Sequence, residues 1–172
     1  MNYKITNIVC SCEYNFPIDL DNLHISNVDY RKKRFNGAII KLKKPKATIL
    51  LFNNGKVISV GNKSEHDGLN SLKIMSKKLN KCGYITIINN FKIINIVGVL
   101  YLENKLTTEN VFKLLPNCIY EPQLFPAIIY KDICKSLIFH SGKIIITGAK
   151  SLETFEGFAN YIYNILKIKK ED

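Results

Sequence analysis

Short apolar runs bounded by turn residues predict most of the strands of this chain. The strands expected in the first half are Tyr3–Glu13, Phe35–Lys43, Ala47–Phe52 and Lys56–Gly61. Those expected in the second half are one long strand or two within Thr86–Leu102, followed by Pro126–Ile133, Ser136–Phe139 and Lys143–Gly148. Asn53-Asn54-Gly55 and Lys44-Pro45-Lys46 are expected turns, the first because Asn and Gly accept positive φ.

Apolar residues three or four positions apart predict one long helix in each half. Ser64 is the expected N-cap of the first helix and Gly83 its end, and Ser151 is the expected N-cap of the second. The two apolar stripes are Leu69, Leu72, Met75, Leu79 and Cys82, and Phe155, Phe158, Ala159, Ile162 and Ile165. Shorter helices are expected over Asp19–Asn27 and from Thr107 or Thr108 to about Leu114.

The chain also contains an internal duplication. The block from Phe52 to Ser64 recurs 87 residues later from Phe139 to Ser151, and Asn7-Ile8-Val9 matches Asn95-Ile96-Val97. The duplication predicts two similar repeats, 1–84 and 85–172. No flexible linker separates them, so we expect one continuous domain with a joined sheet. Two similar lobes suit a ligand that is itself nearly twofold, such as duplex DNA.

Strand side chains alternate between two faces of a sheet, and helices can cover only one of them. If Ile8, Cys10 and Cys12 lie under the helices, then Asn7 and Val9 face the other way. That second face would hold Val, Ile, Leu and Phe among Asn, Thr and Lys, which is too apolar to leave in water. A DNA minor groove would match it, with base edges inside and phosphates along both walls.

Composition agrees with an anionic partner. The net charge is +11 over 172 residues, which favours nucleic acid or a membrane surface, and 47% apolar residues suffice for a core. No apolar run reaches the length of a membrane span, and no secretory signal opens the chain. Five cysteines without a disulfide spacing favour a reducing compartment, and Cys10-x-Cys12 is interpreted as core thiols in preference to a zinc site.

Several motifs, in order and duplicated, resemble the TATA-box-binding protein family over essentially the whole chain. They are Tyr120-Glu-Pro-Gln-Leu-Phe-Pro126, Lys33-Arg34-Phe35, Lys44-Pro45-Lys46 and two Gly-Lys-x4-Gly-x-Lys-Ser blocks. The resemblance implies an α+β saddle of two pseudo-symmetric repeats. Its curved antiparallel sheet would have ten strands, with helices on the convex face and DNA under the concave face.

The resemblance also implies which residues contact DNA, although core packing is the ordinary alternative for any one of them. The intercalating positions are Phe35, Phe52, Phe125 and Phe139. The groove-floor positions are Asn7, Val9, Leu50, Ile58, Val60, Asn95, Val97, Leu137, Ile145 and Thr147. The phosphate-facing positions are Arg34, Lys41, Lys56, Lys131 and Lys143. Asn amides would donate to A·T acceptors, and the aliphatic residues would clash with the guanine amino group.

Family partners are implied as well: a transcription factor IIB-like protein at Glu121, Gln123 and Leu124, and other initiation factors with RNA polymerase. The location implied is the nucleus, or the site of viral transcription if the chain is viral; an AT-rich protist would also suit it. Two departures stand out. Val60 replaces a threonine that Thr147 keeps, and the second hairpin is three residues shorter.

These departures leave an alternative open, in which a saddle without TATA preference serves as a platform for proteins or other DNA. We expect no enzyme, because neither a phosphate-binding Walker loop nor paired carboxylates are found. We expect no cofactor or metal.

Overall fold

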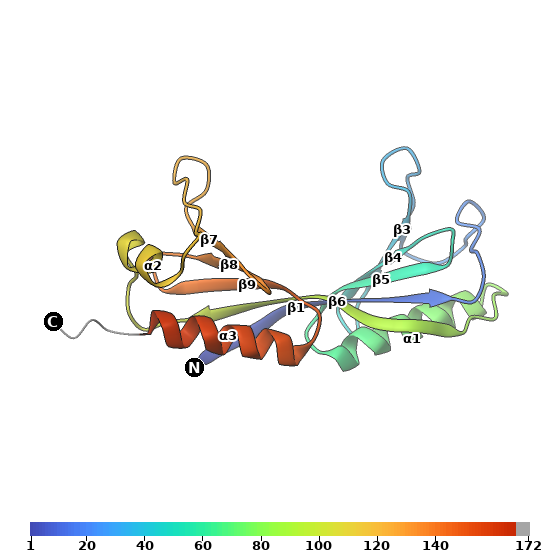
Figure 1. Cartoon of the computed structure of the whole chain (residues 1–172). Helices are drawn as coiled ribbons and strands as arrows, with labels where there is room; N and C mark the ends of the chain where they lie inside the picture. Colours follow the sequence, from blue (N-terminus) through green and yellow to red (C-terminus); the bar gives the residue numbers. More distant parts are fainter. Residues whose placement is uncertain (168–172) are drawn as a thin grey trace. The chain divides into compact units, whose positions relative to one another are not determined.

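The computed structural model describes residues 1–167, which form the α+β fold that the sequence predicts (Figure 1). The strands are β1 Asn2–Tyr14, β2 Val28–Asp29, β3 Ala38–Leu42, β4 Ala47–Leu51, β5 Lys56–Asn62, β6 Ile88–Tyr101, β7 Ile128–Lys131, β8 Lys135–Ile138 and β9 Lys143–Ala149. The helices are α1 Glu65–Asn80, α2 Thr108–Leu114 and α3 Leu152–Leu166. The two-residue strand β2 was not predicted.

The chain divides into two compact units that are described separately. The N-terminal unit is Asn7–Ile94, and the C-terminal unit combines Met1–Thr6 with Asn95–Asp172. The strand order is β2-β3-β4-β5-β1 in the first and β6-β9-β8-β7 in the second. The long strands β1 and β6 each contribute residues to both units.

Ten strands were expected, whereas the described residues form nine. The tenth is reduced to a single bridge, in which Ile119 and Ile129 exchange both backbone hydrogen bonds (N–O 2.9 and 2.8 Å). This bridge lies where β2 pairs with β3 in the N-terminal unit. The pairing is therefore kept at both places but falls below the length of a strand in the C-terminal unit.

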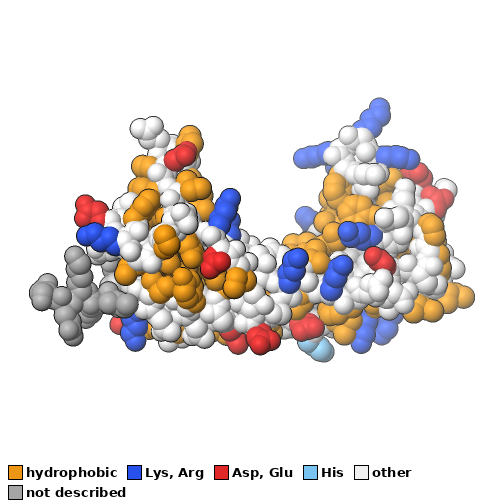
Figure 2. All heavy atoms as spheres, viewed as in Figure 1, with side chains coloured by type: hydrophobic (Ala, Val, Ile, Leu, Met, Phe, Trp, Pro, Cys, Tyr) orange, Lys and Arg blue, Asp and Glu red, His pale blue; other side chains and the backbone are white. Residues whose placement is uncertain are grey.

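Each long helix covers one face of its unit's sheet: α1 packs on β4 and β5, and α3 packs on β9 (Figure 1). Along the strands, fully buried residues alternate with half-buried ones, as in β4 and β9. The buried set contains Ile8, Cys10 and Cys12, as the parity of β1 predicts. Hydrophobic side chains are nevertheless also exposed on each unit, as Figure 2 shows.

In both units a glycine lies against a larger residue where the long helix packs on a strand. The glycine is on the helix in one unit and on the strand in the other. In the N-terminal unit, Gly68 of α1 lies directly over the Cys10 side chain, so a Cβ at Gly68 would overlap its Sγ. In the C-terminal unit the glycine is Gly98, on the strand, and the large residue is Phe155 of α3. Each contact fits because one partner has no side chain.

The predicted helix starts are confirmed. Ser64 Oγ accepts the N–H of Asp67 at 3.0 Å and Ser151 Oγ accepts that of Thr154 at 3.0 Å. Thr107 caps α2. The first long helix ends at Asn80, short of Gly83, so Cys82 lies outside it and is exposed rather than part of a buried stripe.

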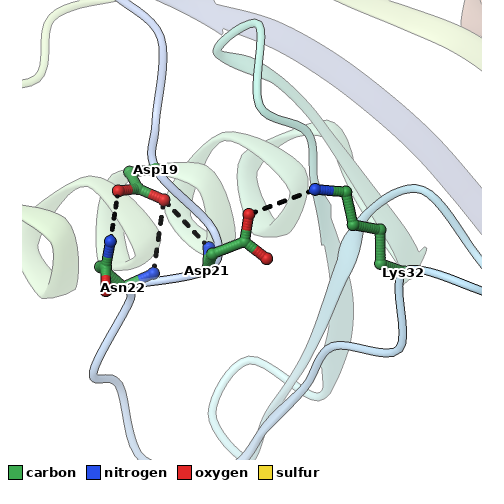
Figure 3. Close-up of polar contacts among 4 residues, drawn as sticks. All are labelled: Asp19, Asp21, Asn22 and Lys32. Atoms are coloured by element: carbon green, nitrogen blue, oxygen red, sulfur yellow. Dashed lines mark hydrogen bonds and ion pairs between the residues drawn. The ribbon is translucent and has the colours of Figure 1, made fainter.

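The predicted helix over Asp19–Asn27 is wrong, since these residues form turns and irregular backbone. The Asp19 carboxylate accepts the backbone N–H groups of Asp21 and Asn22 (3.1 and 3.3 Å) and the Asn22 side-chain amide (2.7 Å), as Figure 3 shows. These hydrogen bonds lower the pKa of Asp19, and the bond from the Asn22 side-chain amide has the largest effect. These bonds would also suit a helix N-cap, but the backbone is irregular over residues 23–25 and no helix follows. Asp21 in turn binds Lys32 at 3.3 Å.

Candidate nucleic-acid interface

The sheet face opposite α1 carries a row of aliphatic side chains across three neighbouring strands. In this row Leu50 lies between Ile39 on one side and Ile58 on the other, by the strand register. All three are half-buried, whereas the residues before and after each of them on its own strand are buried. A second row runs parallel to the first and places Lys41 opposite Thr48, and Thr48 opposite Val60. This face is thus apolar in the middle with a lysine at its outer strand.

The C-terminal unit repeats both rows. Leu137 lies between Ile129 and Ile145, and Val99 continues the row beyond Ile145. The second row is Lys131, Lys135, Thr147 and Val97. All but Lys131 are half-buried. The predicted aliphatic residues therefore lie together on one face within each unit.

Asn7 and Asn95 are held in one amide orientation by the backbone. The Asn7 Oδ1 accepts the N–H of Gly61 at 2.7 Å, and the Asn95 Oδ1 accepts the N–H of Gly148 at 2.8 Å. Both glycines have positive φ (95° and 103°) next to an irregularity in strand pairing. Since the oxygen is engaged, each side chain offers its Nδ2 hydrogens as donors.

Thr147 and Val60 make the two units unequal at this point. The Thr147 hydroxyl donates to the Asn95 Oδ1 at 3.3 Å. Val60 has no hydroxyl, so the Asn7 oxygen receives only the glycine bond among the described contacts. The asparagine of the C-terminal unit is therefore fixed by one more hydrogen bond.

Each unit also pairs two phenylalanines. The ring centroids are 5.8 Å apart for Phe35 and Phe52 and 6.3 Å apart for Phe125 and Phe139, with interplanar angles of 64° in both pairs. Phe35 and Phe125 are 36% and 40% exposed, which is unusual for phenylalanine. The shorter second hairpin thus leaves the ring pair in place.

The loops that carry Phe35 and Phe125 have the same backbone turn but different charge. In the first tip loop (residues 30–36), Arg34 and Phe35 donate their N–H groups to the Arg31 carbonyl. In the second tip loop (residues 120–126), Leu124 and Phe125 donate theirs to Glu121. Figure 2 shows Lys and Arg around the first loop and an acidic residue at the second. Glu121, Gln123 and Leu124 are all exposed, Leu124 by 80%.

Four of the five predicted phosphate-facing residues are exposed: Arg34, Lys41, Lys56 and Lys131. Lys143 is half-buried, with its Nζ 5.9 Å from the Phe139 ring centroid. Lys56 lies opposite Glu13 in the strand register, and that carboxylate accepts the Asn90 amide at 2.9 Å. A role in DNA binding stays a prediction for all these residues.

Four residues of the two faces were missed by the sequence interpretation: Ile39, Thr48, Ile129 and Lys135. The signal was available, because each lies two positions from a predicted residue on the same strand and therefore shares its face. Lys135 lies between the predicted strands Pro126–Ile133 and Ser136–Phe139, whereas it begins β8.

All five cysteines are free thiols in the part of the chain that the structure describes. Burial, and the nearby Glu65, raise the pKa of Cys10 to about 11, and burial raises that of Cys12 to about 12, so both thiols stay protonated. Among the described residues, no three His, Cys, Asp or Glu side chains gather where they could hold a metal ion. None of the described helices is long and apolar enough to span a membrane.

Comparisons with known proteins agree with this geometry. The family described as "Transcription factor TFIID (or TATA-binding protein, TBP)" matches the chain twice, over residues 2–82 and 90–168. The TATA-box-binding protein of Acanthamoeba castellanii is 37% identical over 94% of this chain and 65% of its own length. That of Spodoptera frugiperda is 36% identical over 98% of this chain and 57% of its own. The chain thus spans about three fifths of these relatives.

A solved structure of the Methanococcus jannaschii TBP is similar to the chain along its full length. The TM-score is 0.86 at 31% sequence identity, and the match covers 97% of this chain and 99% of that one. The fold predicted from the resemblance is therefore confirmed.

Proposed function

Since the chain belongs to the TATA-binding protein family, we propose that it binds AT-rich promoter DNA in the minor groove and nucleates assembly of a transcription initiation complex. The observation that carries this proposal is the sheet face present in each unit. It combines an uncovered aliphatic row, an asparagine locked as a donor, and a pair of partly exposed phenylalanines.

Selectivity for A·T pairs has two sources in these faces. The aliphatic rows around Leu50 and Leu137 would lie against the groove floor, where the guanine amino group would clash with them and lose its hydration. The Nδ2 groups of Asn7 and Asn95 would donate to adenine N3 or thymine O2. A donor facing another donor is unfavourable, so the same amides disfavour guanine.

Bending follows from the phenylalanine pairs. Insertion of the rings between base steps would unstack them and bend the duplex, a mode of binding for which this family is the standard example. Within each pair one ring comes from a tip loop and the other from the end of a hairpin strand, where Gly55 or Gly142 closes the turn at positive φ. The two anchors hold the rings as a preformed wedge, so little order is lost on binding.

Protein partners are proposed for the second tip loop. The exposed Glu121, Gln123 and Leu124 offer an apolar contact flanked by one carboxylate. A transcription factor IIB-like protein with a basic surface would suit them, and RNA polymerase would follow through that factor. The nucleus is the proposed location.

The test is binding of labelled AT-rich and GC-rich duplexes at one fixed salt concentration. The chain should prefer the AT-rich duplex, and Phe52→Ala with Phe139→Ala should weaken its binding to that duplex. Two stacked rings at about 1–2 kcal/mol each correspond to an affinity for the AT-rich duplex that is lower by about 30-fold or more. Phe112→Ala, which removes an exposed ring on α2, is the matched control and should change nothing. Equal affinity for both duplexes, unaffected by the Phe52 and Phe139 changes, refutes the proposal.

A second candidate is a platform that has lost TATA preference, and Val60 is the observation that favours it. End-to-end energy transfer on a labelled AT-rich duplex distinguishes the two. A shortened distance on binding supports the TATA-type function, and an unchanged distance supports the platform.

A further inference from the structure

Lys135 occupies a place on the candidate interface that no prediction assigned to DNA binding. It begins β8, two positions before Leu137, and therefore lies on the same face. In the strand register it is opposite Lys131 of β7 and opposite Thr147 of β9. It is half-buried, unlike Lys131, which is exposed.

The corresponding place in the N-terminal unit is held by Thr48, which lies between Lys41 and Val60. The difference arises in the preceding turn. The β3–β4 connection passes through Lys43, Lys44 and Lys46, with its cations at the tip. The shorter β7–β8 connection starts its second strand at a lysine, so that the cation lies on the face itself.

Two lysines directly opposite each other on one face of an antiparallel pair repel one another. Among the residues that the structure describes, no carboxylate forms an ion pair with Lys131 or Lys135. Asp132, the nearest acid in sequence, is the acceptor of a 3.5 Å contact from the Tyr130 hydroxyl. The repulsion is therefore uncompensated in the protein alone, and an anion bound between the two ammonium groups would relieve it.

We propose that Lys135 is a further DNA-contacting residue, which binds a backbone phosphate together with Lys131. This inference rests on the proposed function and adds to it a cationic pair that only the C-terminal unit possesses. The four-carbon stem of Lys135 would lie on the aliphatic row beside Leu137, and its ammonium group would reach the groove wall. The contact is independent of sequence and sensitive to salt.

The experiment compares Lys135→Thr, which installs the residue found at Thr48, with the unchanged chain on one AT-rich duplex across a salt series. One phosphate contact contributes about 0.9 to the slope of log K against log salt. The magnitude of this negative slope should therefore decrease by about 0.9, and the affinity for DNA at 0.1 M salt should fall by about eightfold. Lys135→Arg should keep both values. Lys113→Thr at the end of α2 removes an exposed lysine elsewhere in the same unit and should leave the slope unchanged.

The reciprocal variant Thr48→Lys builds the same lysine pair beside Lys41 and should increase the magnitude of the slope by about 0.9. Thermal melts of each variant show whether it is folded before binding is compared. An unchanged slope for Lys135→Thr, or an affinity loss without a slope change, overturns the phosphate contact while wild-type binding upholds the proposed function. Absence of wild-type binding to any duplex refutes the proposed function and this inference together.

Discussion

Replacement of Asn95 by aspartate tests whether a fixed amide donor selects A·T pairs. Aspartate has almost the same shape, and its carboxylate can still accept the Gly148 N–H (2.8 Å) and the Thr147 hydroxyl (3.3 Å). Only the Nδ2 donor is lost, and an oxygen with negative charge takes its place. The free protein should therefore be at least as stable as the wild type, because hydrogen bonds to a charged acceptor are stronger.

The loss of DNA affinity can be estimated from these contacts. A groove acceptor left without its donor costs about 2 kcal/mol, and an unpaired carboxylate facing that acceptor adds at least about 1 kcal/mol. The sum of about 3 kcal/mol corresponds to a hundredfold weaker complex with an AT-rich duplex. A duplex with a G·C pair at the contacted step should lose less, since the guanine amino group can donate to the carboxylate.

Fluorescence anisotropy with the two duplexes measures both effects, and urea unfolding measures the stability of the free variant. Asn110→Asp, on the exposed surface of α2, adds the same charge away from the face and serves as the control. If Asn95→Asp bound the AT-rich duplex as tightly as Asn110→Asp does, the amide would not be a DNA contact and the reasoning would fail.

Three further predictions concern the hydroxyl, the core and the thiols. Thr147→Val removes the second hydrogen bond to the asparagine oxygen and should weaken AT-rich binding by about 1 kcal/mol, or about fivefold, in the same anisotropy assay; wild-type affinity would contradict this. Gly68→Ala should lower the free energy of unfolding in urea by about 1–3 kcal/mol because its Cβ would overlap Cys10, whereas Gly157→Ala, with open space around it, should raise it by up to about 1 kcal/mol. Burial, and the nearby Glu65, raise the pKa of Cys10 from about 9 to about 11, so its contribution to stability is fully present below pH 9 and is lost as pH rises through 11. Unfolding free energies measured from pH 8 to 11 should therefore decline, and a thiol reagent at pH 8 should modify exposed Cys82 first; a flat pH profile would contradict the first expectation.

The sequence predicts well wherever a local rule and the tertiary fold agree. The parity of β1 follows from alternation, and the starts of the three helices at Ser64, Thr107 and Ser151 follow from side-chain capping. The resemblance implies Leu50 and Leu137 as matching positions of the two halves, and the structure places them in matching rows of the two sheet faces; their contact with DNA stays a prediction.

The errors arise where the tertiary fold overrides the local pattern. Leu20 and Leu23 are buried as an amphipathic helix would require. The Asp19 carboxylate even accepts the N–H groups that a helix N-cap would bind, yet the backbone is irregular over residues 23–25 and no helix follows. Lys135 was missed because it lies between the predicted strands Pro126–Ile133 and Ser136–Phe139. Its place in the sheet depends on where the shortened hairpin closes, and the sequence pattern does not show this.

The exchange of large and small residues between helix and strand has a consequence for how the duplicated halves can evolve. A gene-conversion event that copied α3 over α1 would place a phenylalanine against Cys10, and the reverse event would replace Phe155 by glycine opposite Gly98 and leave a ring-sized cavity there. Either chimera would be selected against, although the donor segment is already part of the same protein. The paired substitutions therefore prevent gene conversion from making the two halves identical. The halves can then diverge elsewhere, as at Lys135 in one and Thr48 in the other.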